Sequence, residues 1–471
     1  MPHPRLRRLA LFAAGALLCL GLGIAGLEAW RARPEALPVP AAHVSVRLLS
    51  DIPVYAPPKG VTPRAVVVHF SDGEDGVPAA LVKAGAVVLT VDTERFRKAV
   101  ADRAVAEHQD CIYLAGDVGD IAAAAQRALG MSDYFQPIFT GTGPGSTLAY
   151  LSFGNAPPNT LTGAIGTGFT DRIDMPVPFC PVPTMTRTTA GDWEAGLSEP
   201  LQGQAVLFAG PQDLPRFQAM ARGNPTLAVE PDAGAPADQI TAALDRLAPR
   251  GEDAALPLVQ LPAQSRTGAP VPPRALAVVL SGDGGWRDID MQLGDLLQKD
   301  GIQVVGLDSL RYFWAQKQPG TIAADLSRAI TSADPSGRLQ VMLLGYSFGA
   351  DVLPFAQPLL PQGIRDRVAL TALLAPGRTT DFRVHVTGWL GVQSGSADIV
   401  GAVAKLPVAT TLCVWGKDEG KDSACSDPSL DSVPQIQTAG GHHFDGNYKG
   451  LAATLLDRFA KNAPEVAALQ R

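Results

Sequence analysis

The chain alternates short, continuous apolar segments with longer stretches in which apolar residues recur at helical spacing. Continuous apolar runs bounded by turn residues are typical of strands buried on both faces of a parallel sheet. One set of predicted strands comprises Arg64–Phe70, Ala86–Val91, Cys111–Ala115, Pro137–Thr140, Gly163–Gly166 and Gln204–Ala209. A second set comprises Ala275–Leu280, Gln303–Leu307, Gln340–Leu344, Val368–Leu374 and Ala409–Trp415. Strands separated by helical segments predict an α/β fold.

The two sets of strands follow the same plan. Val61-Thr-Pro-Arg-Ala resembles Val271-Pro-Pro-Arg-Ala, and Ile138-Phe-Thr-Gly-Thr-Gly-Pro-Gly aligns with Met342-Leu-Leu-Gly-Tyr-Ser-Phe-Gly. Repeated motifs of this kind indicate an internal duplication. We therefore predict two tandem domains over residues 31–250 and 271–471. A polar, Pro-rich stretch, taken as 251–270, is the predicted linker.

The N-terminus has the charge pattern of an exported protein. Arg5, Arg7 and Arg8 precede an uncharged apolar stretch, Leu9–Leu27, as in a secretory signal. That stretch is nearly as long as the roughly 20 residues needed to cross a bilayer. Because the arginines come first, the rest of the chain is expected outside the cytoplasm. Residues 1–30 are predicted to be a signal peptide or an N-terminal anchor.

Charge and cysteine content bear on three kinds of site: nucleic-acid surfaces, disulfides and metal centres. The net charge of −7 argues against nucleic acid as a partner, since such a surface must offset phosphate charge. Four cysteines, Cys111, Cys180, Cys413 and Cys425, can form disulfides in an oxidising compartment, with four free thiols as the alternative. Cys413 and Cys425 flank one short loop and are the expected pair. Metal-ligand spacings are absent, so we predict no metal and no cofactor.

The catalytic chemistry is predicted in the second half. Val341–Leu353 reads as an apolar strand, then Gly345-Tyr-Ser-Phe-Gly349, then a helical pattern. This is the context of the nucleophile elbow of α/β-hydrolases, in which the serine is exposed on a tight strand-to-helix turn. Ser347 is therefore the predicted nucleophile. The N–H of Phe348, at the start of the following helix, is a predicted oxyanion donor. Both halves are accordingly predicted to be α/β-hydrolase-like domains, each a mostly parallel sheet flanked by helices.

A serine hydroxyl needs a base and an acid in order to react. The Gly-rich loop before the last helix contains His442 and His443. His442 is favoured because Gly-His-x-Phe is the commoner arrangement of such loops, and His443 is the alternative. The acid is expected after the strand Ala409–Trp415. Asp418 and Glu419 both fit that position better than Asp422, and the choice between them stays open.

A second oxyanion donor is expected from the loop after the first strand of this half. Ser281-Gly-Asp-Gly-Gly-Trp-Arg-Asp-Ile289 follows Ala275–Leu280. Its glycines allow backbone N–H groups to turn toward a developing charge. Gly282, Asp283 and Gly284 are therefore predicted oxyanion residues.

The first half is predicted to be noncatalytic. Gly143 stands at its elbow where Ser347 stands in the second half. Between His108 and His385 the sequence has no histidine, so a base in the corresponding late loop is lacking. The first half is expected to be a degenerate partner domain.

Several motifs of the second half resemble those of the bacterial VirJ/AcvB virulence-protein family. They are Ser281–Asp288, Gly345–Asp351, Gly388-Trp-Leu-Gly391 and Gly440-Gly-His-His-Phe-Asp-Gly446. The two-part, exported layout is similar to AcvB, whereas the VirJ type corresponds to the second half alone.

This resemblance implies a periplasmic serine esterase. Its substrate would be aminoacyl-phosphatidylglycerol, lysyl or alanyl, presented at a membrane surface, and its products the free amino acid and phosphatidylglycerol. Two alternatives remain: a hydrolase of another ester, and a noncatalytic adaptor of a secretion or virulence system with secretion-system proteins as partners.

Overall fold

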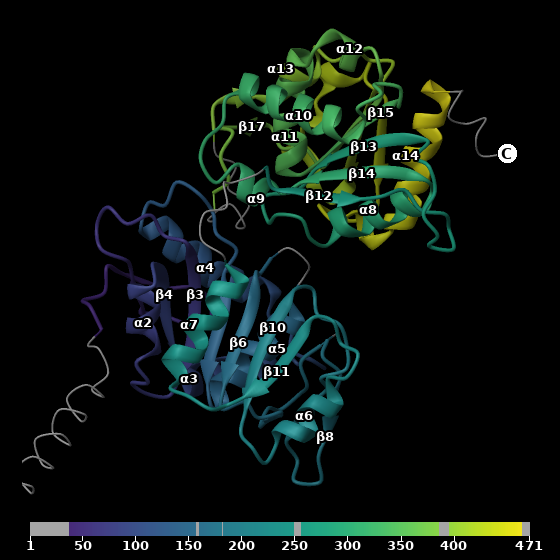
Figure 1. Cartoon of the computed structure of the whole chain (residues 1–471). Helices are drawn as coiled ribbons and strands as arrows, with labels where there is room; N and C mark the ends of the chain where they lie inside the picture. The colour runs from purple at the N-terminus through teal and green to yellow at the C-terminus, as the bar shows by residue number, and fades with distance from the viewer. Residues whose placement is uncertain (1–36, 157–159, 181, 249–255, 386–394, 464–471) are drawn as a thin grey trace, which may run out of the picture.

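The structure is a computed structural model that describes residues 37–156, 160–180, 182–248, 256–385 and 395–463. Within these ranges the chain forms two α/β domains, each built around a mostly parallel sheet with helices on both faces (Figure 1). The predicted signal or anchor and the Gly388–Gly391 motif lie outside the described residues. Among the residues that are described, no helix is both long and apolar enough to cross a membrane.

The first domain has an eight-stranded sheet in the order β1-β2-β4-β3-β5-β6-β10-β11. These strands are β1 (Ala42–Val44), β2 (Ile52–Tyr55), β3 (Ala65–Ser71), β4 (Ala86–Asp92), β5 (Ile138–Thr142), β6 (Gly163–Thr167), β10 (Gln204–Ala209) and β11 (Leu227–Pro231). Its helices are α2 (Val77–Lys83), α3 (Thr93–Ala106), α4 (Ala115–Ala128), α5 (Pro144–Asn155), α6 (Leu214–Met220) and α7 (Pro236–Leu247). A small separate sheet contains β7 (Arg172–Ile173), β8 (Met185–Arg187) and β9 (Trp193–Ala195).

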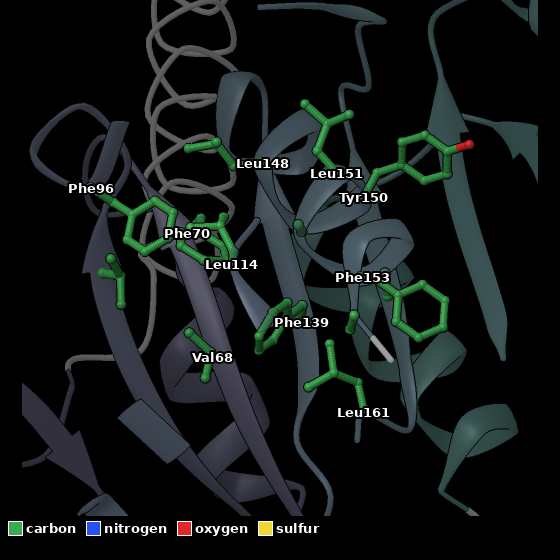
Figure 2. Close-up of a cluster of buried hydrophobic side chains, with 14 of the residues drawn as sticks. Val68, Phe70, Phe96, Leu114, Phe139, Leu148, Tyr150, Leu151, Phe153 and Leu161 are labelled. Carbon is green, nitrogen blue, oxygen red and sulfur yellow. The ribbon is translucent and has the colours of Figure 1, made fainter. Parts of the chain in front are cut away.

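The core of this domain explains its continuous apolar strands. Val66 and Val68 of β3 face a cluster that includes side chains of α3, α4 and α5, whereas Val67 faces α2 and α7. Figure 2 shows the first cluster, in which the ring of Phe70 lies 5.0 Å from that of Phe96 and 5.9 Å from that of Phe139. Because both faces are covered, burial favours apolar residues at every position of the central strands.

The second domain has a seven-stranded sheet in the order β12-β14-β13-β15-β16-β19-β20. These strands are β12 (Leu258–Leu261), β13 (Ala275–Leu280), β14 (Ile302–Leu307), β15 (Val341–Tyr346), β16 (Val368–Leu374), β19 (Thr411–Gly416) and β20 (Gln435–Thr438). Its helices are α8 (Ile289–Lys299), α9 (Ser309–Tyr312), α10 (Pro319–Ala333), α11 (Phe348–Ala356), α12 (Gln362–Arg365), α13 (Ile399–Val403) and α14 (Tyr448–Asn462). Helices α8 and α14 cover one face, and α10, α11 and α13 cover the other.

Shorter elements connect the strands of the second domain. A two-stranded sheet contains β17 (Thr379–Thr380) and β18 (Ala397–Asp398). The 3₁₀ turns are η1 (Gln357–Leu359), η3 (Lys417–Asp422), η4 (Ala424–Ser426), η5 (Pro428–Leu430) and η6 (Phe444–Gly446).

The two domains share one topology, as the repeated motifs predict. In both, six parallel strands occur in the same order, β4-β3-β5-β6-β10-β11 in the first and β14-β13-β15-β16-β19-β20 in the second. Each sheet continues with an antiparallel strand at the same edge, β2 beside β4 and β12 beside β14. The elbows also match, with φ/ψ of 53°/−126° at Gly143 and 51°/−118° at Ser347. The sequence repeat therefore reflects a repeated fold.

Two sequence-based predictions of the fold are wrong. Cys111–Ala115 is not a strand: Ile112 forms only an isolated bridge with Phe179, and Ala115 begins α4. The N–H of Leu114 donates to the side chain of Asn155 at 2.6 Å instead of to a strand. The 251–270 stretch is not wholly a linker either, because Leu258–Leu261 pairs with β14 and extends the second sheet. Its central glutamine breaks the apolar run, as is common in an edge strand.

Both possible disulfides are present. The predicted pair, Cys413 and Cys425, is confirmed, and it joins the middle of β19 to η4. A second disulfide joins Cys111 to Cys180 in the first domain. Spacing predicts the first pair because its loop is short, whereas the second closes a long loop that only the folded domain brings together.

Candidate active site

Ser347 lies on the sharp turn between β15 and α11, at the carboxyl end of the second sheet. Its φ of 51° is rare for a residue with a side chain and is maintained by the surrounding structure. A Cβ atom at Gly345 would lie 2.5 Å from the carbonyl oxygen of Gly349, and one at Gly349 would lie 2.1 Å from that of Leu280. Both flanking glycines are therefore required for this turn to form against its neighbours.

Ser347, His442 and Glu419 form one hydrogen-bonded row. His442 Nε2 lies 2.8 Å from Ser347 Oγ, and His442 Nδ1 lies 2.8 Å from Glu419 Oε1. The other oxygen of Glu419 accepts the N–H of Gly416 at 2.7 Å. The carboxylate is thus held from two sides, and with Nδ1 as the donor the Nε2 lone pair faces the serine hydroxyl.

The other residues considered as the acid or the base do not belong to this row. Asp418 is exposed. Its backbone N–H donates to Gly440 O at 2.9 Å. Asp422 is exposed at the rim of the pocket. His443 directs its Nδ1 at Tyr346 Oη, 3.3 Å away, rather than at the serine. The prediction of Asp418 as the acid is therefore not supported, because the 3₁₀ turn after β19 directs Glu419 inward.

The pocket in front of Ser347 contains charges of both signs. Its polar and charged lining includes Asp283, Arg287, Asp288, Asp290, Asp351, Asp381, Arg383, His385, Glu419 and Asp422. Asp351 is one helical turn after Ser347 and accepts the N–H of Gly377 at 2.7 Å. Burial raises the pKa of Asp351 to about 7, although that hydrogen bond and the nearby His442 act in the opposite direction. The spacing of Asp351 from Ser347 in the helix is the sequence signal for its place in the site.

The predicted oxyanion loop lies beside the serine, since Gly282, Asp283 and Gly284 line the same pocket as Ser347. Burial raises the pKa of Asp283, although the charges of Arg287 and His442 act in the opposite direction. Burial also raises the pKa of Asp290. The oxyanion role of Gly282, Asp283 and Gly284 stays a prediction.

Phe348 is the first residue of α11. Its N–H has no carbonyl partner within the helix, since the first turn of a helix leaves such donors unpaired. The position of Phe348 next to Ser347 agrees with the predicted oxyanion role. Asp290 was not predicted from the sequence; an aspartate on the apolar face of α8 is the only signal for it.

Residues 274–463 match the family described as "Bacterial virulence protein (VirJ)". The second domain contains these residues and is called the VirJ domain below. No curated protein is detectably similar to the chain.

Three solved structures that are similar to the chain each cover less than half of it. Est1E from Butyrivibrio proteoclasticus is 12% identical, with 44% of this chain and 95% of that chain covered and a TM-score of 0.31. MenH from S. aureus is 10% identical, with 44% and 100% covered and a TM-score of 0.33. XC6422 from Xanthomonas campestris, described as an a/b serine hydrolase without lid, is 16% identical, with 45% and 97% covered and a TM-score of 0.30.

The first domain presents a different set of side chains at the position equivalent to the VirJ-domain site. Gly143 supplies no nucleophile in the matching turn. His69 is fully buried beneath it, with Nδ1 2.8 Å from Thr140 Oγ1 and Nε2 2.9 Å from Asp75 Oδ2. Asp75 also accepts the hydroxyl of Thr142 at 2.8 Å. These contacts occupy the imidazole on both nitrogens, which favours a structural role for His69.

The electrostatics of His442 predict the pH dependence of any reaction at Ser347. Burial alone lowers the pKa of His442, but the hydrogen bond and charge of Glu419, followed by the charges of Asp351 and Asp283, raise it above its ordinary value. If the neutral imidazole acts as the base, kcat/KM falls as the pH drops through this raised pKa. We expect an acid limb with an apparent pKa above about 6.5, measured as kcat/KM for p-nitrophenyl butyrate from pH 5 to 9. An acid limb below that value would contradict the assignment.

Proposed function

We propose that the VirJ domain is a serine esterase. The observation that carries this proposal is the hydrogen-bonded row of Ser347, His442 and Glu419, all three of which line a pocket. In the reaction Ser347 Oγ attacks the ester carbonyl carbon while His442 Nε2 takes its proton. The carbonyl–oxygen bond to the alcohol then breaks, and His442 returns the proton to the leaving oxygen. Water, deprotonated by His442, hydrolyses the acyl-enzyme and regenerates Ser347.

The proposed substrate is aminoacyl-phosphatidylglycerol, which the VirJ match and the pocket charges support. Such an ester has an ammonium group on the carbon next to the reacting carbonyl and a phosphodiester further away. Asp283 and Asp351 line the pocket near Ser347, and Arg287 and Arg383 line it as well. An ammonium group favours the charged form of a nearby carboxyl, and guanidinium groups suit phosphate oxygens. The exported layout of the sequence favours action at the periplasmic face of a membrane.

The direct test is a lipid assay. The purified full-length protein in detergent is mixed with vesicles that contain lysyl-phosphatidylglycerol, alanyl-phosphatidylglycerol or phosphatidylglycerol alone. We expect release of the amino acid, with phosphatidylglycerol appearing in equal amount and no fatty acid. Release of fatty acid instead would reject this substrate and favour a hydrolase of acyl esters. No release of any kind, together with no labelling of Ser347 by a fluorophosphonate, would favour the adaptor alternative.

A further inference from the structure

A tryptophan of the VirJ domain is buried by the first domain. Trp314 follows α9 in a loop, yet only 1% of it is exposed. It forms a small cluster with Ala123 and Tyr134 of the first domain, and its ring lies 4.9 Å from that of Tyr134. Its indole N–H donates to Met131 O at 3.0 Å. Figure 1 shows α4 of the first domain close to α9 of the second, where this contact forms.

Arg127, at the end of α4, binds the same loop with its whole guanidinium group. The group lies 3.4 Å from the centre of the Trp314 ring. One terminal nitrogen donates to Trp314 O at 2.8 Å, and the other donates to Val384 O at 2.6 Å. Arginine combines stacking on an aromatic ring with donation to two acceptors, which a lysine ammonium cannot reproduce. One side chain of the first domain thus joins two segments of the VirJ domain.

Those two segments are already paired with each other. Val384 N–H donates to Phe313 O at 3.0 Å, and Lys317 N–H donates to Phe382 O at 3.1 Å. The side chain of Gln316 donates to Asp381 O at 2.9 Å. Arg127 donates to Trp314 O and Val384 O beside the Val384–Phe313 hydrogen bond. Val384 is buried there.

Residues 381–385, in the second of these segments, form one wall of the pocket. Asp381, Arg383 and His385 line the pocket in front of Ser347. The carboxyl group of Asp381 lies 2.5 Å from His385 Nε2, so the two side chains are held together. The position of this wall therefore depends on the backbone of residues 381–385, which Arg127 binds through Val384 O.

We propose that Arg127 is a positioning residue for the active site, and that the first domain acts by holding the 381–385 wall of the VirJ domain in place. This assigns a role to a domain whose elbow position is occupied by Gly143 instead of a serine. The guanidinium binds two backbone carbonyls rather than a carboxylate, so its bonds order the chain without altering the charge of the catalytic residues. The wall does not include Ser347, His442 or Glu419, so the effect is expected on substrate binding rather than on the reactivity of the serine.

The test compares the full-length wild type with Arg127→Gln, Arg127→Lys and a control, Arg172→Gln. Arg172 is an exposed first-domain arginine whose partner is Glu194 of the same domain. We measure kcat and KM for p-nitrophenyl butyrate, the rate of Ser347 labelling by a small fluorophosphonate, and hydrogen exchange over residues 379–385. Arg127→Gln is expected to raise KM about fivefold and to speed exchange in the wall about tenfold, with kcat and the labelling rate within about twofold of wild type. Arg127→Lys is expected to be intermediate.

Each outcome separates this proposal from the esterase proposal. If the wild type is not labelled at Ser347, the esterase proposal fails, while hydrogen exchange still reports on the wall. If exchange and KM of Arg127→Gln match those of Arg172→Gln, the positioning role is overturned. If Arg127→Gln does not fold, Arg127→Lys takes its place, because it retains the positive charge but not the combined stacking and paired donation of the guanidinium. Unchanged exchange and KM in that variant would equally overturn the proposal.

Discussion

Replacing Ser347 with alanine is expected to lower kcat/KM by roughly 10⁴- to 10⁶-fold. In the proposed reaction the Ser347 hydroxyl forms the acyl-enzyme, and it is the hydroxyl that His442 Nε2 contacts. That loss corresponds to roughly 5–8 kcal/mol of transition-state stabilisation. The measurement is amino-acid release from lysyl-phosphatidylglycerol together with hydrolysis of p-nitrophenyl butyrate.

The fold is expected to survive this substitution. The backbone of the turn is maintained by Ser347 N–H, which donates to Leu374 O at 2.8 Å, and by the two flanking glycines. Alanine retains both features, so the free energy of unfolding is expected to change by less than about 1 kcal/mol. Near-wild-type activity in a well-folded Ser347→Ala protein would reject the nucleophile assignment. A variant that unfolds would call for Ser347→Gly, because glycine adopts this φ without strain.

Replacing Glu419 with glutamine is the second change with a large expected effect, about 10²- to 10⁴-fold in kcat. Glu419 accepts two N–H groups, one from His442 and one from Gly416. A glutamine has only one acceptor oxygen. Its amide group would face one of the two donors, and the imidazole would turn or change tautomer to avoid it. A proton placed on His442 Nε2 would prevent that nitrogen from accepting the proton of Ser347.

Asp418→Asn is the matched control for Glu419→Gln. It makes the same chemical change one residue away, on an exposed side chain. We expect its kcat to stay within about twofold of wild type. Since the Glu419 charge raises the pKa of His442, Glu419→Gln should also move the acid limb of kcat/KM to lower pH. A large loss in Asp418→Asn with little loss in Glu419→Gln would reverse the assignment of the acid.

The two domains share a fold but differ in the residues at the elbow and in the place of the histidine. Both have the same sheet order and the same elbow conformation, with Gly143 in one and Ser347 in the other. The histidine of the first domain, His69, lies on a strand and is bound on both nitrogens. In the VirJ domain His442 comes from the loop before α14 and faces the serine. Of the two elbow residues, only Ser347 has a side chain, and His442 contacts it.

Much of the fold can be predicted from the sequence because the patterns that indicate it involve neighbouring residues. Strands β10, β13 and β16 begin and end where the apolar runs do, since a strand buried on both faces excludes polar residues along its whole length. The elbow can be predicted as well, because a tight strand-to-helix turn requires glycines at fixed positions around the serine. The failures came where a short apolar segment had no such constraint, as at Cys111–Ala115, or where an edge strand, β12, lay in a polar stretch.

The sequence by itself determined the repeated α/β plan, Ser347 at its elbow and the loop that contains His442, because backbone restrictions and burial patterns act over neighbouring residues. Tertiary structure decided which carboxyl group contacts His442, since the direction of a side chain in a 3₁₀ turn depends on packing against the histidine loop. Arg127 and Val384 are 257 residues apart in the chain; only the packing of one domain against the other joins them.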